Sequence, residues 1–229
     1  ERFLTFLLAL YAYHYSVYLN SGQLKNGRLA VLFALFIPFF KDVAVLLSVI
    51  PAITTIAAGS LGAVPGRPKW GAIRPLSWMH SYALEIAIIS LAPFFLASFA
   101  ILSALPSLAA GVQRYDAHLG FSVLALDIRL IFFLVFIAFR IWLVGRKGAD
   151  ITALDGLNLA ALAYGFALYA LVGIEGSNYM SLPIQFVAVL DILMIWENYA
   201  APSLKHMNSR QTQAVAIGTM LLLLTIEDR

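Results

Sequence analysis

Charged side chains inside long apolar stretches are the residues of this sequence that could do chemistry. They are Glu85, Asp127, Arg129, Arg140, Asp191 and Glu197, with Asp155 at the boundary of another stretch. An ionisable side chain inside a membrane segment is costly, because lipid does not solvate its charge. Such a residue is therefore a candidate member of a functional site.

Two of these residues are expected at the same depth. Arg129 and Asp191 each lie ten residues into an apolar stretch, 119–144 and 181–200 respectively, and both stretches are expected to enter the membrane from the same side. A helix rises about 1.5 Å per residue, so both side chains lie roughly 15 Å deep, near the midplane. We expect them to form an ion pair. Asp127 is two positions from Arg129 and faces roughly the opposite side of its helix, so it needs another partner or a wet cavity.

A second charged cluster is expected near the other end of these stretches, where Arg140, Glu85 and Glu197 fall at similar depths. Both groups have an alternative interpretation. Polar pairs between membrane helices often only orient those helices, and the side chains of Arg140 and Glu197 can extend to the membrane surface.

The composition indicates the elements that must position these residues. The chain has 229 residues, of which 62% are hydrophobic and 12% charged, and its mean hydropathy is +0.87. A soluble domain is nearer half apolar and a quarter charged. Long apolar blocks between short charged clusters predict an all-α fold, a polytopic transmembrane helix bundle with seven or eight membrane segments, some short or broken. We expect a single transmembrane domain over residues 1–229, incomplete at both ends, in which residues 59–81 form a basic cytoplasmic loop.

The number of segments depends on Lys41 and Asp42, which interrupt the apolar stretch 29–58. If the chain turns there, the basic loops all fall on one side of the membrane, and the positive-inside rule makes that side cytoplasmic. These loops carry Lys25 and Arg28; Arg67, Lys69 and Arg74; Arg146 and Lys147; and Lys205 and Arg210. We predict this turn, with a solvent-accessible Lys41 at its tip on the opposite side.

Tyrosines recur at helical spacing near the start of the chain, where Tyr11, Tyr15 and Tyr18 predict one aromatic face. Such a face can stack on a sugar or an isoprenoid chain, and it can equally belong to an ordinary aromatic belt. The candidate substrate-binding residues are therefore Arg129, Asp191, Asp127, Tyr11 and Tyr15. The chain has no cysteine, and its four histidines show no metal-ligand spacing. We expect no metal, no cofactor and no nucleic-acid partner.

The aromatic-rich blocks, the intramembrane Arg and Asp residues and the turn "FFKDV" at 39–43 resemble bacterial polysaccharide polymerases and O-antigen ligases. The resemblance implies a substrate in which a glycan is linked to undecaprenyl diphosphate. Those families carry a large extracytoplasmic loop with essential arginines and, in ligases, a histidine, whereas the outward loops here are short and nearly neutral. Carried onto this sequence, the resemblance makes Arg114 and His118 the catalytic candidates. Arg114 would stabilise a diphosphate leaving group, and His118 would act as a base toward the acceptor hydroxyl.

Three functions stay open at this point. The chain is expected to be a membrane glycosyltransferase, polymerase or ligase acting on a lipid-diphosphate-linked glycan, a secondary transporter or channel, or a noncatalytic subunit of a membrane complex. Its expected partners are membrane lipids, a lipid-linked glycan and other membrane subunits. Its expected location is the bacterial inner membrane.

Overall fold

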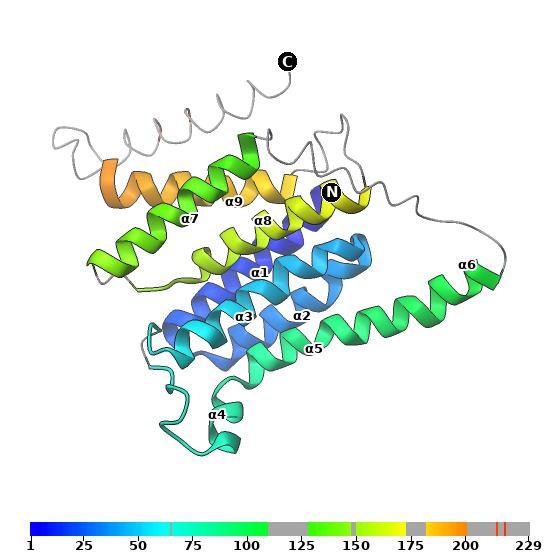
Figure 1. The fold of residues 1–229 in the computed structure, drawn as a ribbon, viewed down its shortest axis with the longest axis horizontal. Helices are drawn as coiled ribbons and strands as arrows, with labels where there is room; N and C mark the ends of the chain where they lie inside the picture. The colour runs from blue at the N-terminus through cyan, green and yellow to red at the C-terminus, as the bar shows by residue number, and fades with distance from the viewer. Residues whose placement is uncertain are drawn as a thin grey trace.

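The computed structural model describes residues 1–64, 66–109, 128–147, 150–172 and 182–200, together with residues 214 and 218. Every regular element in these ranges is a helix, and Figure 1 shows them as a bundle with one helical arm. The expected all-α class is therefore confirmed. Two stretches in the described part, Asp42–Ser60 and Ala83–Ser107, are long and apolar enough to cross a membrane.

The first two helices form a tight hairpin. Helix α1 (Arg2–Ser21) ends where Gly22 adopts a left-handed conformation with φ 68°, and the Gly22 N–H donates to the carbonyl of Tyr18 at 2.8 Å. Glycine has no Cβ and adopts this conformation without steric cost, so it is a common helix terminator. Helix α2 (Leu24–Phe40) then returns along α1.

The chain breaks at Lys41, as the sequence predicts. Helix α2 stops at Phe40, Lys41 is extended with φ −161°, and a 3-10 turn η1 (Asp42–Val45) leads into α3 (Leu46–Ser60). The prediction of an accessible Lys41 is wrong, however. Its ammonium lies 3.2 Å from the Glu1 carboxylate and its side chain is 13% exposed. The start of α1 lies at this end of the bundle and supplies the counter-charge.

The segment expected as a loop over 59–81 is shorter and more ordered than predicted. Helix α3 continues to Ser60, and a further helix α4 (Pro75–Ser81) follows the irregular stretch after it. A proline at the first helical position favours this start, because that position needs no N–H donor. Helix α5 (Ala83–Phe99) then runs through a π-helical turn η2 (Ala100–Ala104) into α6 (Leu105–Ala109). Figure 1 shows this arm extending away from the bundle.

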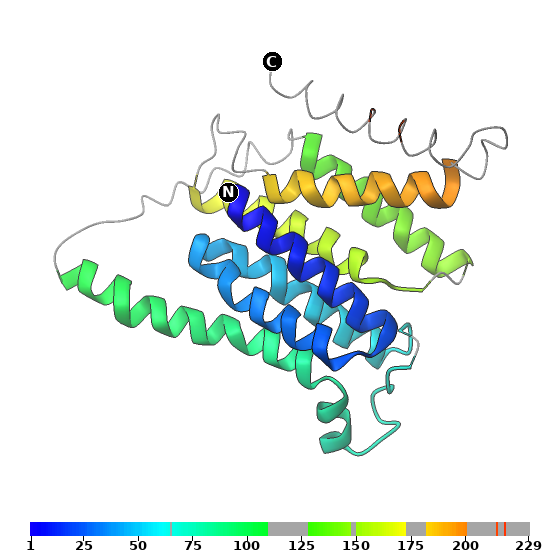
Figure 2. The same cartoon turned by 180° about the vertical axis from the view of Figure 1, so that it is seen from behind.

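The remaining helices pack on the other side of the bundle (Figure 2). They are α7 (Ile128–Lys147), α8 (Ala153–Val172) and α9 (Leu182–Ile195), and a π-helical turn η5 (Trp196–Ala200) follows α9. Helix α8 is central, because it contacts α3, α7, α9 and α1. Its glycine at 156 lies against α3, where an added Cβ would come within 2.7 Å of the Pro51 Cα. Small side chains at such positions let two helices approach closely.

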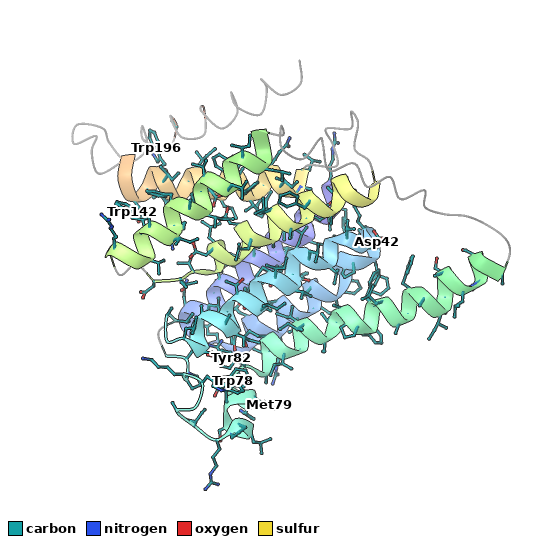
Figure 3. All side chains as sticks on the ribbon, viewed as in Figure 1. Asp42, Trp78, Met79, Tyr82, Trp142 and Trp196 are labelled. Carbon is teal, nitrogen blue, oxygen red and sulfur yellow. The ribbon has the colours of Figure 1, made fainter. Side chains whose placement is uncertain are left out.

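Successive helices alternate in direction, so their ends gather at two ends of the bundle (Figures 1 and 2). The C-terminal ends of α1, α3 and α7 lie at one end, together with the starts of α2, α5 and α8. We call this the basic end, because Lys25, Arg28, Arg67, Lys69, Arg74, Arg146 and Lys147 lie in or beside these connections. Figure 3 places Asp42 at the opposite end.

Candidate functional site

The best-defined charged contact in the bundle joins α7 to α8. Arg140 Nε donates to Asp155 Oδ1 at 2.6 Å and its Nη2 to Asp155 Oδ2 at 2.8 Å, a two-pronged pair in which both side chains are nearly buried. Arg140 Nη2 also donates to the Asp150 carbonyl at 3.0 Å. A planar guanidinium matches a carboxylate in this way, which fixes the geometry as well as the charge.

Asp155 is held by the start of its own helix. The Thr152 backbone N–H donates to Asp155 Oδ2 at 2.8 Å and the Thr152 hydroxyl to the same oxygen at 3.1 Å. Thr152 precedes α8 and Asp155 occupies its third position, so this is a helix N-cap in which the carboxylate satisfies an otherwise unpaired N–H. The sequence "DITALD" therefore folds locally into the acceptor that Arg140 needs.

The predicted cluster of Arg140, Glu85 and Glu197 is wrong. Arg140 pairs with Asp155, and Glu85 pairs with Arg67, whose Nη2 lies 2.7 Å from Glu85 Oε1. Glu197 lies in η5 and is exposed. Equal depth was not sufficient to predict a contact, because α5 lies against α2 and α3 while α7 lies against α8 and α9.

Arg67 ties three helices together at the basic end. Besides Glu85 on α5, it donates to the Tyr18 hydroxyl at the end of α1, at 2.9 Å, and to the carbonyl of Ser81 at the end of α4. Its guanidinium carbon lies 5.2 Å from the Tyr18 ring centroid and 5.3 Å from that of Tyr82, so two aromatic faces enclose the charge. Burial lowers the pKa of this guanidinium. The Glu85 carboxylate and the Tyr18 hydroxyl together raise the pKa by more than burial lowers it, so the net shift is upward.

The aromatic side chains around this group are packed tightly. Tyr82 donates its hydroxyl to the Pro68 carbonyl at 3.1 Å. Trp78 lies 5.0 Å from the Tyr82 ring and 4.7 Å from the Trp70 ring, measured between centroids. Figure 3 shows Trp78 and Tyr82 close together where α4 meets α5. These contacts anchor the stretch 61–82 on the bundle, and the Arg67 group is structural in character.

An apolar pocket of about 360 Å³ lies between α3, α7 and the start of α8. The charged groups in its wall are Arg140 and Asp155, and Asn158 contributes an amide. The complete lining is Thr54, Phe136, Ile137, Arg140, Ile141, Val144, Gly145, Ile151, Asp155, Asn158 and Leu159. A predominantly apolar cavity with a few polar groups is the usual form of a site that binds a small or lipid-like molecule.

A more polar cavity of about 400 Å³ lies beside the apolar pocket, and Ile151 lines both. The end of α1, the second half of α3, Val64 and the start of α8 enclose it at the basic end. Its full lining is Ser16, Leu19, Asn20, Thr55, Val64, Asp150, Ile151, Thr152, Ala153 and Leu154. The end of α1 and two connections of the basic end, after α3 and before α8, therefore meet around one cavity.

Asp191 lies behind the apolar pocket, fully buried in α9. Its Oδ1 accepts a hydrogen bond from Asn158 Nδ2 at 2.8 Å. Asp191 Oδ2 and Asn158 Oδ1 have no hydrogen-bond partner among the described residues. Arg129 lies in α7 and its side chain is outside the described part, so the predicted Arg129–Asp191 pair stays a prediction.

Tyr11, Tyr15 and Tyr18 do form one helical face, and that face is buried in the core. The Tyr11 hydroxyl donates to the Ser48 carbonyl at 2.9 Å and the Tyr15 hydroxyl to Thr55 Oγ1 at 2.8 Å. The Tyr11 and Tyr15 rings stack with centroids 5.4 Å apart. Within the described part of the chain, the substrate-binding candidates Tyr11 and Tyr15 pack against protein and line neither of the two cavities described above.

The catalytic candidates Arg114 and His118, and with them Asp127, lie outside the described residues. Sequence reasoning missed Arg67 and Asn158. Asn158 had a readable signal, because it follows Asp155 by three residues and so lies on the same face of its helix. Arg67 had none beyond its charge, since its partners are distant in sequence.

No group of three or more His, Asp or Glu side chains that could hold a metal ion occurs within the described ranges. The chain matches no family model, no curated protein and no solved structure.

Proposed function

We propose that this chain is an integral membrane protein of seven or eight membrane segments that acts on a lipid-diphosphate-linked glycan as a glycosyltransferase, polymerase or ligase. The observation that carries the proposal is the apolar pocket beside the Arg140–Asp155 pair. An isoprenoid chain needs an apolar cavity that opens toward a polar region at the membrane surface, and this pocket adjoins the polar cavity at the basic end.

The surface of the bundle supports the membrane part of this proposal. Large apolar side chains are exposed along the arm, among them Phe94, Leu96, Ile101, Leu102 and Leu105. Only 11% of the most apolar window in Ala83–Ser107 is buried. A soluble protein rarely exposes a continuous apolar surface of this size, whereas lipid covers it at no cost.

The orientation follows from the loops. Because the basic connections lie at one end of the bundle, the positive-inside rule assigns that end to the cytoplasmic side, in the inner membrane of a bacterium. The two cavities then face the cytoplasmic side. Residues 110–127, which hold Arg114 and His118, join the far end of α6 to the start of α7. The sequence predicts that these catalytic candidates lie on the outward side.

A second function, as a noncatalytic subunit of a membrane complex, is favoured by one observation. Helix α5 packs against α2 and α3, but η2 and α6 extend beyond the bundle and contact mainly α5 and each other (Figure 1). A neighbouring membrane protein could pack along this arm as readily as lipid.

The test of the proposed function fills the apolar pocket and measures glycan transfer in membranes that contain the chain. Gly145→Trp adds an indole at a residue that lines the pocket, where an added Cβ meets no atom within 4 Å. We expect transfer to fall at least about tenfold, which corresponds to about 1.4 kcal/mol of lost binding. The control Val135→Trp changes an exposed position on the same helix that does not line the pocket, and it should transfer normally.

Arg114→Ala and His118→Ala test the catalytic candidates in the same assay. The proposal fails if the membranes show no transfer that depends on this chain, or if Gly145→Trp leaves transfer unchanged while the protein stays folded. Normal transfer by both alanine variants would remove Arg114 and His118 from the mechanism and leave the lipid pocket standing.

A further inference from the structure

Residues 61–82, which join α3 to α5, are attached to the bundle along one side and exposed along the other. We call them the connecting segment. Arg67 and Tyr82 supply the inner contacts described above. The Trp70 backbone N–H also donates to the Ser60 carbonyl at 3.0 Å, which ties the middle of the segment to the end of α3. The outward side chains are therefore presented from a backbone that the bundle holds in place.

The exposed side chains of the connecting segment are largely apolar. Leu61 is 83% exposed and Leu76 is 80% exposed, and Trp70 and Met79 are exposed as well. Leu76 and Met79 are three residues apart in α4, so they lie on one face of that helix. Figure 3 shows Met79 farther from the bundle than Trp78. A helix of a soluble protein turns its apolar face toward the core, whereas this face is exposed.

Two exposed basic residues, Lys69 and Arg74, lie among these apolar side chains, and the segment contains no Asp or Glu. The Lys69 stem crosses Gly62 so closely that a Cβ at Gly62 would collide with Lys69 Cε. Gly62 has a φ of 81°, a conformation that glycine adopts readily. The Arg67 charge is compensated by Glu85. The positive charge that the segment presents outward is therefore that of Lys69 and Arg74.

The position of the connecting segment is that of a membrane surface. It begins directly after the candidate span Asp42–Ser60 and ends directly before the candidate span Ala83–Ser107. Two spans that leave the hydrocarbon at this level bring the segment to the lipid headgroups. An acidic protein could match Lys69 and Arg74, but lipid also covers the apolar side chains beside them, and it is the partner that this position supplies.

A surface that mixes cations with tryptophan and aliphatic side chains fits the boundary between headgroups and acyl chains. Lys and Arg attract the phosphates of anionic lipids there. We infer that the connecting segment binds anionic phospholipid in the leaflet at the basic end. Lys69 and Arg74 meet the headgroup phosphates, and Leu76 and Met79 meet the upper acyl chains. The inference rests on the membrane part of the proposed function and adds which lipid the chain selects and through which residues.

The absence of native cysteine allows a single reporter to be placed in the segment. Ser77→Cys, at an exposed position in α4, carries a nitrobenzoxadiazole fluorophore. The protein is reconstituted in nanodiscs of phosphatidylcholine and phosphatidylglycerol. A nitroxide quencher is attached to the acyl chain of one lipid or of the other, at the same overall composition. The same fluorophore at Leu102→Cys, an exposed position on the arm, reports whether the protein lies in the bilayer.

We expect half-quenching at Ser77→Cys to need at least about fivefold less quencher on phosphatidylglycerol than on phosphatidylcholine. That ratio corresponds to about 1 kcal/mol, the attraction of one basic residue to an anionic surface. Adding Lys69→Gln and Arg74→Gln should bring the ratio to about one. The control, Lys25→Gln with Arg146→Gln, removes two exposed charges of the basic end outside the segment and should keep the preference.

The outcomes separate the lipid surface from the membrane assignment. If both lipids quench Leu102→Cys and neither quenches Ser77→Cys, the segment does not meet lipid and its face is left for a protein partner. Equal quenching of Ser77→Cys by the two lipids, or a preference that survives the loss of Lys69 and Arg74, also overturns the inference. So does an equal loss of preference in the control, because the basic end would then attract anionic lipid without a defined surface. If Leu102→Cys is not quenched at all, the membrane part of the proposed function fails and the inference fails with it.

Discussion

Arg67 is the side chain that closes the basic end of the bundle. It joins the end of α1, the end of α4 and the start of α5, and its guanidinium lies between two tyrosine rings. Its partner Glu85 is fully buried, and one oxygen of that carboxylate has no hydrogen-bond partner among the described residues. Glu85 therefore depends on Arg67 for the compensation of its charge.

Replacing Arg67 by alanine should destabilise the protein strongly. Removing one member of a buried ion pair typically costs about 3–5 kcal/mol, because the other charge stays buried and uncompensated. The measurement is thermal unfolding of the purified protein in micelles, with Lys69→Ala as the control. Lys69 is an exposed basic residue of the same stretch, so its loss should leave the midpoint nearly unchanged.

A double variant separates charge from packing. Arg67→Met combined with Glu85→Leu removes both charges, and it should unfold at a higher temperature than Arg67→Ala alone. If Arg67→Ala is no less stable than Lys69→Ala, the Arg67–Glu85 pair does not hold the basic end together.

The contacts of individual side chains, such as the pairing of Arg67 with Glu85, were the hardest feature to predict. Arg67 was expected only as one charge of the basic cytoplasmic loop, because its contact with Glu85 forms only in the folded protein. Tyr11, Tyr15 and Tyr18 were correctly placed on one face by their spacing, but spacing does not say whether a face meets protein or substrate. The structure answers this for Tyr11 and Tyr15, because both side chains are buried against α3.

Helices α3 and α8 approach each other closely at one glycine. Gly156 lies against the backbone of Pro51, and a Cβ there would come within 2.7 Å of the Pro51 Cα. Backbone atoms cannot move aside as a flexible side chain can, so a methyl group must push the two helices apart. The start of α8, which carries Asp155 and lines both cavities, would move with it.

Gly156→Ala should therefore lower stability by about 1–3 kcal/mol, the usual cost of overpacking, and should widen the apolar pocket. Gly145→Ala is the matched control, since a Cβ at Gly145 meets no atom within 4 Å. Unfolding midpoints of both variants in the same micelles give the comparison. Equal midpoints would show that α3 and α8 are not in close contact.

Elements were more predictable than side-chain pairs. The break at Lys41 followed from the charges alone, because two adjacent charged residues do not continue an apolar helix and a turn there groups the basic loops. The short helix α4 was not foreseen, since glycine and proline in 59–81 indicated a loop. A proline can also begin a helix, and Pro75 does so.

The whole molecule has two unlike ends and an apolar surface between them. The basic end carries both cavities, the Arg67 group and the start of α8, while the opposite end carries the Glu1–Lys41 pair. Figure 3 places Trp142 toward the basic end and Asp42 at the other. With this surface in a membrane, the two ends face different compartments. Both cavities then lie on one side of the membrane and the Glu1–Lys41 pair on the other.

Side-specific labelling of single cysteines tests that claim most directly. Lys25→Cys and Lys69→Cys are exposed at the basic end, and Asp42→Cys lies at the opposite end. With a membrane-impermeant maleimide, Asp42→Cys should label in intact cells, whereas Lys25→Cys and Lys69→Cys should label only in inside-out vesicles. Labelling of Asp42→Cys and Lys69→Cys from the same side would contradict the account.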